Sequence, residues 1–373
     1  MKSKDKIEGC LFGGAAGDAL GYPVEFLEDR VIFEKYGENG ISEYDLADGV
    51  AQVSDDTQMT LYTANGLLLG TIIGATLRIK TPYRTSIEAC YEDWLRTQNP
   101  SQGGHEQGKY SWLNNIPEMN HKRAPGTTCI SCISQKNYGS TTKPKNKSKG
   151  CGGLMRVAPV GLYFEESPRL PLEAIDKMGA EVAALTHGHE LGYIPAAMLV
   201  HIINVLCYNT DVTILAAVED AKDTMLKLFP TSEYLPYLIE LINKAIELSK
   251  IKEIDDLDGI RELGEGWVAE ETLAIAVYCA LKYEHDFERA IIAAVNHSGD
   301  SDSTGSVTGN IMGASLGLKG IPSKYVNNLE LKDTILEIAD DLYKDCRMTG
   351  FGNEYDEIWG QKYIYHTFPN GKQ

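Results

Sequence analysis

Apolar residues recur at helical spacing along most of the chain, whereas the alternating pattern of a half-buried strand is scarce. Positions three and four apart share one face of an α-helix, so this periodicity predicts helices. No βαβ alternation, no repeat of 20–50 residues and no clean linker interrupts them. We therefore expect an all-α protein, a compact orthogonal arrangement of many helices, with a single domain spanning 1–373. The eleven predicted helices lie at about 6–20, 57–77, 83–96, 171–186, 190–207, 212–228, 233–250, 268–284, 286–297, 303–318 and 331–345.

Two of these helices carry glycine at every fourth position, which is unusual because glycine in a helix interior costs about 1 kcal/mol relative to alanine. A spacing of four places all the glycines of one helix on one face. Close approach of two buried backbones would compensate for the cost, so both helices are predicted to be central. The glycines concerned are Gly13, Gly17 and Gly21 in the first helix and Gly305, Gly309, Gly313 and Gly317 in the second.

Two segments depart from the helical pattern. Residues 97–149 are polar and loop-rich, and are interpreted as an insertion; 346–373 form a C-terminal extension. Long loops within a compact domain are usually functional or mobile. The insertion ends in a basic cluster, for which a solvated loop and an anion-facing lid both remain open: Lys143, Lys145, Lys147 and Lys149.

Composition narrows the classes of protein. The 35 Lys and Arg residues against 53 Asp and Glu residues give a net charge of −18, which disfavours nucleic-acid binding. Asp18 interrupts the apolar stretch that would otherwise resemble a signal sequence, and the apolar run 67–77 is too short to cross a bilayer. Eight scattered cysteines are typical of reduced thiols. We expect a cytoplasmic monomer without membrane or nucleic-acid partners.

Three short motifs suggest other functions, and each lacks its required context. The glycines at 13–17 lack the strand and the complete spacing of a dinucleotide-binding fingerprint. Ser315 lies in a GxSxG string, but its neighbours continue a helix, whereas the serine-hydrolase elbow follows a strand. Cys129 and Cys132 form a CxxC downstream of His105 and His121, but no second pair completes a zinc site.

Two short segments concentrate oxygen ligands directly before a helix: Ser54-Asp55-Asp56-Thr57 and Asp300-Ser301-Asp302-Ser303. One N-cap needs one such residue, and adjacent carboxylates repel each other unless a cation neutralises them. All-oxygen ligation suits Mg²⁺, Mn²⁺ or Ca²⁺. The pattern favours a metal site, with enough carboxylates to hold two ions, over a pair of helix caps.

Several longer strings, in this order, resemble the ADP-ribosylglycohydrolase family, which includes the dinitrogenase reductase-activating glycohydrolases and the ADP-ribosylarginine hydrolases. The resemblance runs from about residue 7 to 322, so it covers most of the chain. It implies an all-α fold with a two-metal site at the base of an ADP-ribose cleft. The strings are GCLFGGAAGDALGYPVEF (9–26), SDDTQMTLYTANGLL (54–68), GCGGLMRVAPVGLYF (150–164), ALTHGHELGYIPAAM (184–198), GEGWVAEETLAIAVYCAL (264–281) and NHSGDSDSTGSVTGNIMGASLGLKGIP (296–322).

The resemblance also implies roles for individual residues. Asp56 would be the acid/base group, Asp302 would bridge the metals, and Glu25 would compete for the acid/base role. Cys151 stands where family members often have asparagine. The implied metal ligands are Ser54, Asp55, Asp56, Asp300, Asp302 and Ser303, and the implied substrate contacts are Gly150, Cys151, Gly152, His187, Gly264, Glu265 and Trp267.

The implied reaction is hydrolysis of the bond between ADP-ribose and a protein side chain, assisted by two Mg²⁺ ions, with Mn²⁺ as an alternative. The strings SDDT, GDSDST and CGGLMR resemble the arginine-hydrolysing branch more than the serine-hydrolysing branch. An ADP-ribosylated protein is then the expected partner. A serine- or other O-linked hydrolase, and a non-catalytic ADP-ribose-binding protein, are the two alternatives.

Overall fold

The computed structural model describes residues 2–77, 79–80, 83–98, 109–345 and 356–366. Helices, with the 3₁₀-helices included, make up 66% of the described residues, which form seventeen α-helices and no sheet, with only isolated β-bridges between loops. The all-α prediction is confirmed. The helices are α1 Lys4–Gly21, α2 Asp29–Tyr36, α3 Asp55–Leu77, α4 Tyr83–Thr97, α5 Thr127–Ser134, α6 Ala158–Tyr163, α7 Leu172–Ala184, α8 Glu190–Tyr208, α9 Ile214–Leu228, α10 Leu235–Ser249, α11 Asp256–Arg261, α12 Ala269–Lys282, α13 Phe287–Val295, α14 Ser301–Leu316, α15 Ser323–Asn327, α16 Lys332–Lys344 and α17 Glu357–Tyr363.

All eleven predicted helices are present, with ends within about two residues of the predicted ones. The six helices that the periodicity did not predict are α2, α5, α6, α11, α15 and α17, none longer than eight residues. Helices this short present too few turns for a repeating apolar face to be recognised. Tertiary packing, rather than their own sequence pattern, stabilises them.

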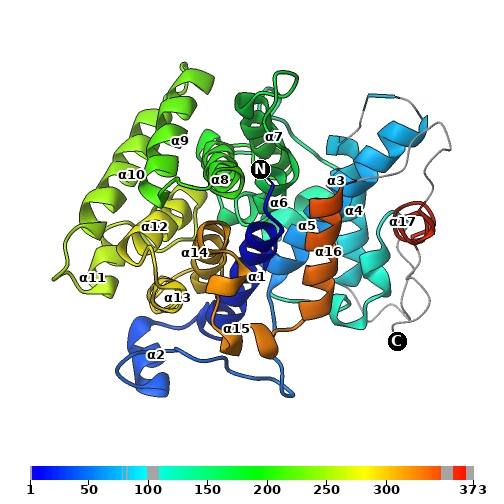
Figure 1. The fold of residues 1–373 in the computed structure, drawn as a ribbon. Coiled ribbons are helices and arrows are strands. Elements are labelled where there is room, and N and C mark those ends of the chain that lie inside the picture. The colour runs from blue at the N-terminus through cyan, green and yellow to red at the C-terminus, as the bar shows by residue number, and fades with distance from the viewer. Residues whose placement is uncertain (1, 78, 81–82, 99–108, 346–355, 367–373) are drawn as a thin grey trace.

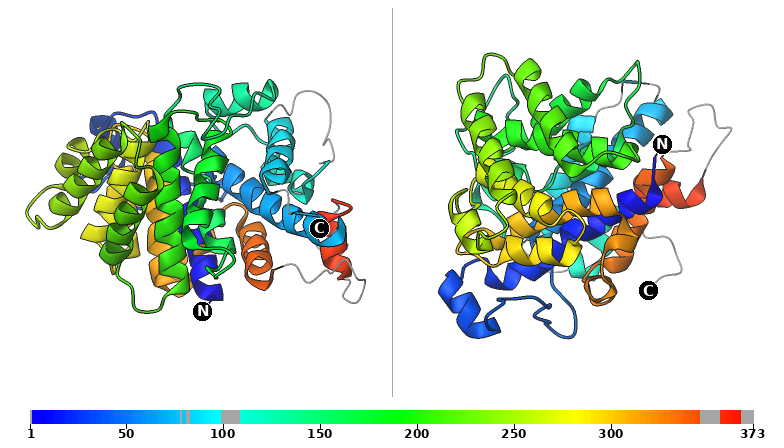
Figure 2. Two further views of the ribbon diagram at one scale, coloured as in Figure 1. Left: turned by 90° about the horizontal axis from the view of Figure 1, so that it is seen from above. Right: turned by 60° about the vertical axis from the view of Figure 1, so that its left-hand side comes forward.

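Helices α1 and α14 pack side by side at the centre of the molecule, between the α9–α11 end and the α4–α17 end (Figures 1 and 2). Their glycines face each other, so each helix provides the close backbone approach that the spacing predicted for the other. A Cβ on Gly13 would lie 2.2 Å from the carbonyl oxygen of Gly309, and one on Gly17 would lie 1.9 Å from that of Gly305. Asn310 adds a hydrogen bond of 2.8 Å from its amide to the carbonyl oxygen of Cys10. Only glycine permits this backbone-to-backbone contact, which fixes how α1 and α14 pack against each other.

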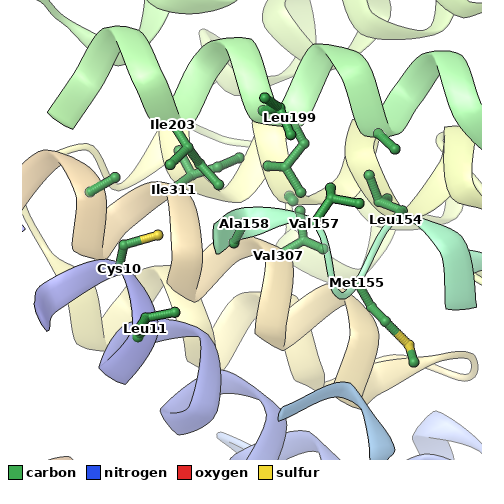
Figure 3. Close-up of a cluster of buried hydrophobic side chains, with 14 of the residues drawn as sticks. Cys10, Leu11, Leu154, Met155, Val157, Ala158, Leu199, Ile203, Val307 and Ile311 are labelled. Carbon is green, nitrogen blue, oxygen red and sulfur yellow. The ribbon is translucent and has the colours of Figure 1, made fainter. Parts of the chain in front are cut away.

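Apolar side chains from α1, α8 and α14 form one part of the core, together with the segment that leads into α6 (Figure 3). Leu199 and Ile203 of α8 lie over Val307 and Ile311 of α14 in this cluster. Two helices, α3 and α8, are long and apolar enough to cross a membrane by length and composition. Their most apolar windows are 72% and 94% buried within the protein, so both serve as core helices here.

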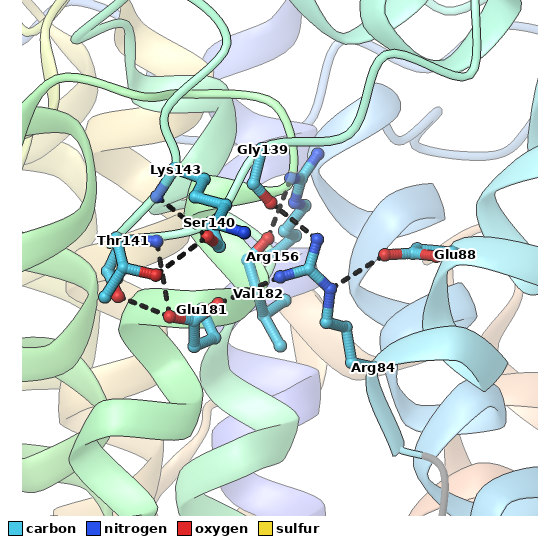
Figure 4. A network of polar contacts seen from close by, with 10 residues as sticks. Arg84, Glu88, Gly139, Ser140, Thr141, Lys143, Arg156, Glu181 and Val182 are labelled. Atoms are coloured by element: carbon cyan, nitrogen blue, oxygen red, sulfur yellow. Dashed lines mark hydrogen bonds and ion pairs between the residues drawn. The ribbon is translucent and has the colours of Figure 1, made fainter.

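The described part of the predicted insertion contains α5 and is anchored to the helices around it. Arg84 of α4 forms ion pairs with Glu88 and Glu181 at 2.9 and 3.0 Å, and donates to the carbonyl oxygen of Gly139 at 2.6 Å (Figure 4). Thr141 donates to the same Glu181. In the basic cluster the first three lysines are exposed, whereas Lys149 forms an ion pair with the buried Glu270.

Candidate active site

The start of α3 is capped by a buried carboxylate from α1. Asp18 accepts hydrogen bonds from the backbone N–H groups of Ser54 and Thr57, at 2.9 and 3.1 Å, and from the Thr57 hydroxyl. The Ser54 hydroxyl accepts from the N–H of Asp56 at 3.1 Å. Because Asp18 and Ser54 fill the capping positions, the carboxylates of Asp55 and Asp56 are not needed as caps of α3.

The start of α14 is arranged differently, because its cap is one of the predicted ligands. Asp300 is the N-cap, and its carboxylate accepts from the N–H of Ser303 at 3.4 Å, while that of Asp302 accepts from the same group at 2.9 Å. The N–H of Asp300 donates to the carbonyl oxygen of Glu265 at 2.9 Å. The cap interpretation therefore accounts for part of the role of Asp300 and leaves most of the acidic cluster unexplained.

Carboxylates from α14 and from the turn after α1 converge in one buried cluster. Oxygens of Glu25, Asp300 and Asp302 all lie within 4.8 Å of one another. Asp55 and Asp56 are buried beside them, and the carboxylate charge of Asp302 acts on both. Among the described residues, nothing hydrogen-bonds to Oε2 of Glu25 or Oδ2 of Asp56. Buried oxygen atoms of this kind are costly unless a cation or a ligand satisfies them.

The electrostatics of the cluster follow from burial and like charge. Burial first, and then repulsion from Asp302 and Asp300, raise the pKa of Glu25 to about 10. The same two causes raise the pKa of Asp18 to about 7 and those of Asp55 and Asp56 well above their ordinary range. Burial also raises the pKa of Asp300 and of Asp302. A divalent cation reverses this preference by stabilising the ionised carboxylates, so the donor set fits a hard cation such as Mg²⁺ or Mn²⁺.

The predicted glycine loop lies directly against this cluster. It forms the 3₁₀-helix η5, Cys151–Gly153, and Gly150 pairs with Val268 through an isolated bridge. The Cys151 thiol donates to Oδ2 of Asp300 at 2.6 Å. Burial, followed by the charge of Asp300, raises the pKa of this thiol well above its ordinary value, so it stays protonated.

His187 lies on the other side of the glycine loop. A Cβ on Gly152 would lie 3.2 Å from the imidazole Cε1, and one on Gly153 would lie 3.2 Å from Nδ1. The ring is 2% exposed, and its Nδ1 is hydrogen-bonded to the Thr186 hydroxyl at 2.8 Å. Burial lowers the pKa of His187 to about 3, so the imidazole is neutral.

The predicted 264–267 loop closes the remaining side of the site. Glu271 accepts from the N–H groups of Glu265 and Gly266, at 3.0 and 3.2 Å, and holds the turn. Trp267 follows and is 39% exposed, so it is not a core tryptophan. Its ring stacks on that of Phe26, which is 72% exposed, with centroids 6.1 Å apart and planes at 19°. The pair forms an aromatic rim next to Glu25.

Comparison with known proteins decides the family. The sequence model of the ADP-ribosylglycohydrolase family matches residues 1–351. The chain belongs to the ADP-ribosylglycohydrolase family. It is 25% identical over 366 residues to ADP-ribosylhydrolase ARH3 of Danio rerio, covering 91% of this chain and 90% of that protein. It is also 25% identical over 347 residues to ADP-ribosylarginine hydrolase Tri1 of Pseudomonas putida, covering 91% of this chain and 78% of that protein.

A solved structure, titled an ADP-ribosylglycohydrolase-related protein complex, has the same fold. It superimposes with a TM-score of 0.55 at 23% identity and covers 91% of this chain and 98% of the other. Membership in the ADP-ribosylglycohydrolase family supports hydrolase activity on an ADP-ribosyl group. The resemblance stated from the sequence is thus confirmed at the level of the family.

Two residues of the site were not predicted from the sequence. Asp18 lies inside one of the quoted family strings, yet it was interpreted only as a break in an apolar stretch. Its signal was available, because a carboxylate within a predicted buried helix needs a partner. Phe26 ends the same string, and nothing in a single sequence shows that it stacks on Trp267.

The alternative motifs have no matching geometry. Ser315 lies in the last turn of α14 and not on a strand-to-helix elbow. Cys129 and Cys132 are free thiols on α5, and the described residues contain no zinc-like cluster around them. His105 lies outside the described residues.

Proposed function

We propose that this protein is a divalent-cation-dependent hydrolase that removes ADP-ribose from modified protein side chains, with ADP-ribosyl-arginine as its preferred substrate. The observation that carries the proposal is the buried carboxylate cluster, in which oxygens of Glu25 and Asp56 have no partner among the described residues. Mutual repulsion of the buried carboxylates costs free energy unless a cation neutralises them, so the cluster is suited to binding a cation rather than an uncharged ligand.

The residues that would hold the ions come from the starts of α3 and α14. They are Ser54, Asp55, Asp56, Asp300, Asp302 and Ser303, with two Mg²⁺ ions proposed and Mn²⁺ as the alternative. When bound, such ions polarise a water molecule and fix the ribose hydroxyls. Asp302 would be a ligand shared within this set, because its charge acts on every other carboxylate of the cluster.

Asp56 is proposed to handle the proton. Water adds to the anomeric carbon while the bond from that carbon to the guanidine nitrogen breaks. The water proton passes to a carboxylate, and the leaving nitrogen receives a proton in return. Glu25 competes for this role, because it lies beside the proposed ligands Asp300 and Asp302 and its Oε2 has no partner among the described residues.

The loops around the cluster are proposed to bind the rest of ADP-ribose. Gly150, Cys151 and Gly152 would face the phosphates, with His187 lining the cleft beside them. Gly264, Glu265 and Trp267 would face the adenosine end. The half-exposed Trp267 supports this assignment, since an aromatic face next to solvent is suited to stacking on a purine.

Arginine is preferred over serine because the strings SDDT, GDSDST and CGGLMR resemble the arginine-hydrolysing branch of the family more than the serine-hydrolysing branch. Sequence identity does not decide between the linkages, since this chain is 25% identical both to ARH3 of Danio rerio and to the arginine hydrolase Tri1 of Pseudomonas putida. A serine- or other O-linked hydrolase therefore remains the alternative within the same class. A cytoplasmic, monomeric, single-domain protein is proposed in either case.

Mass spectrometry of two matched peptides, one ADP-ribosylated on arginine and one on serine, tests the proposal. The expected result is faster release of ADP-ribose from the arginine peptide with Mg²⁺ or Mn²⁺ and none with EDTA. Faster release from the serine peptide would overturn the linkage. Binding of both peptides without release, unchanged by Asp302→Asn, would identify a non-catalytic ADP-ribose-binding protein instead.

A further inference from the structure

A fully buried arginine lies behind His187 and has no carboxylate partner among the described residues. Arg156 is 0% exposed, and its guanidinium lies over the ring of Tyr91 at 4.6 Å. One of its nitrogens donates to the carbonyl oxygen of Val182 at 3.2 Å (Figure 4) and to the Thr186 hydroxyl at 2.7 Å. Burying a guanidinium without a counter-ion is expensive, so a purely structural position would be filled more cheaply by an apolar side chain.

The hydrogen bond from Arg156 to the Thr186 hydroxyl limits where that hydroxyl can direct its own proton. A guanidinium has donors only, so Thr186 must accept from it. The hydroxyl then has its own single proton to donate. Nδ1 of His187 is 2.8 Å away. The other possible acceptor for the Thr186 hydroxyl is the sulfur of Cys129, which already accepts a hydrogen bond from a nitrogen of Arg156 at 3.5 Å. A nitrogen lone pair is a much better acceptor than a thiol sulfur, so the hydroxyl proton belongs on the bond to Nδ1.

A neutral imidazole that accepts at Nδ1 must carry its proton on Nε2. His187 is neutral because burial, followed by the charge of Arg156, lowers its pKa to about 3. Nε2 points toward the glycine loop, where it would lie 3.4 Å from a Cβ on Gly150 and 3.5 Å from one on Gly152. No hydrogen bond from the described residues reaches this nitrogen.

We propose that Arg156 and Thr186 are positioning residues that hold His187 in the Nε2–H tautomer and thereby present a fixed, uncharged donor to a phosphate oxygen of ADP-ribose at the glycine loop. The ligand in this statement rests on the proposed function, whereas the tautomer does not. Because the proton is already on Nε2, the imidazole does not have to change tautomer when an anion binds. A histidine free to exchange tautomers would lack this preorganised donor.

Nitrogen-15 NMR of protein labelled on histidine tests the tautomer in the free enzyme, with His187→Gln used to assign the signal. The expected spectrum shows an unprotonated Nδ1 and a protonated Nε2 for His187. Thr186→Val removes the hydroxyl and should let the Nδ1–H form appear, and the Kd for ADP-ribose in calorimetry should rise on the order of tenfold. Thr186→Ser keeps a hydroxyl and should restore both readings.

Thr63→Val is the matched control, because it also removes a buried threonine hydroxyl near Arg156. Thr63 contacts Tyr91 at 2.6 Å and not His187, so the tautomer and the Kd should stay at wild-type values. An Nδ1–H signal in the wild type, or a Thr186→Val protein with unchanged tautomer and Kd, would overturn the inference. A wild type with the Nε2–H tautomer that fails to bind ADP-ribose would overturn the ligand and the proposed function together.

Discussion

Replacing Glu25 by glutamine should stabilise the metal-free protein at neutral pH. In the unfolded chain this carboxyl ionises near its ordinary pKa of 4.5, whereas burial and like charges raise the pKa to about 10 in the folded protein. A group whose pKa is raised on folding contributes its full stability below pH 4.5 and loses it as the pH rises toward 10. The wild type without metal should therefore become less stable across this range.

The magnitude follows from the pH and the ordinary pKa. At pH 7 the unfolded carboxyl is 2.5 units above its pKa of 4.5, while the folded carboxyl is still protonated. Each unit corresponds to about 1.4 kcal/mol, so the loss at pH 7 is about 3 kcal/mol. Glutamine has the shape of the protonated acid and does not ionise. Glu25→Gln should thus match the wild type at pH 4 and exceed its free energy of unfolding by about 3 kcal/mol at pH 7.

Chemical denaturation in EDTA at pH 4 to 9 measures this difference, and thermal melts should show a Tm higher by roughly 5 °C at pH 7. Glu28→Gln is the matched control, since Glu28 is exposed on the same turn and should change stability little. Added Mg²⁺ should stabilise the wild type by mass action and the Glu25→Gln protein less. A Glu25→Gln protein that is no more stable than the wild type in EDTA at pH 7 would refute the reasoning.

Three further results are expected. Asp302→Asn should leave the metal-free protein as stable as the wild type or slightly more so, but it should abolish hydrolysis and most of the Mg²⁺-induced rise in Tm; an equal rise in both proteins would argue for a mere capping role. Gly309→Ala should cost about 3 kcal/mol in urea unfolding, because its Cβ would lie 1.9 Å from the carbonyl oxygen of Gly13; Gly126→Ala, with nothing within 4 Å of its Cβ, should cost only the loss of about 1 kcal/mol usual for alanine at a helix N-cap. Trp267→Ala should weaken ADP-ribose binding up to about tenfold in calorimetry and remove any ligand-induced fluorescence change; an unchanged Kd would place the adenosine elsewhere.

The long helices were predicted well because the signal for each one, a repeated apolar face, lies within its own segment of the sequence. An apolar face repeated over four turns is visible in any one segment, and α9 and α10 are examples. The glycines at every fourth position also predicted a close backbone approach for α1 and for α14, but they did not identify the partner, which the structure shows to be the other glycine helix. The short helices carry no such repetition and depend on what they pack against.

The candidate site likewise contains residues that the local sequence predicts and residues that depend on contacts between distant segments. Paired aspartates at 55–56 and 300–302 indicate a cation from like-charge repulsion alone, and their burial side by side agrees with that interpretation. The cap formed by Asp18 and the stack of Phe26 on Trp267 depend on contacts between segments far apart in the chain. No periodicity or spacing in a single sequence carries that information.

The contact between α1 and α14 has a consequence for how the protein is made. Gly9 meets its partner Gly313 only after about 300 further residues have been synthesised. At about 5–20 residues per second, the glycine face of α1 waits about 15–60 s on the ribosome without its neighbour. During that time the carboxylates from the two ends of the chain cannot meet, so no nascent fragment ending before α14 can assemble the acidic cluster. The protein therefore acquires its site in one late step, and its nascent chain exposes an apolar, small-residue helix that chaperones are suited to shield.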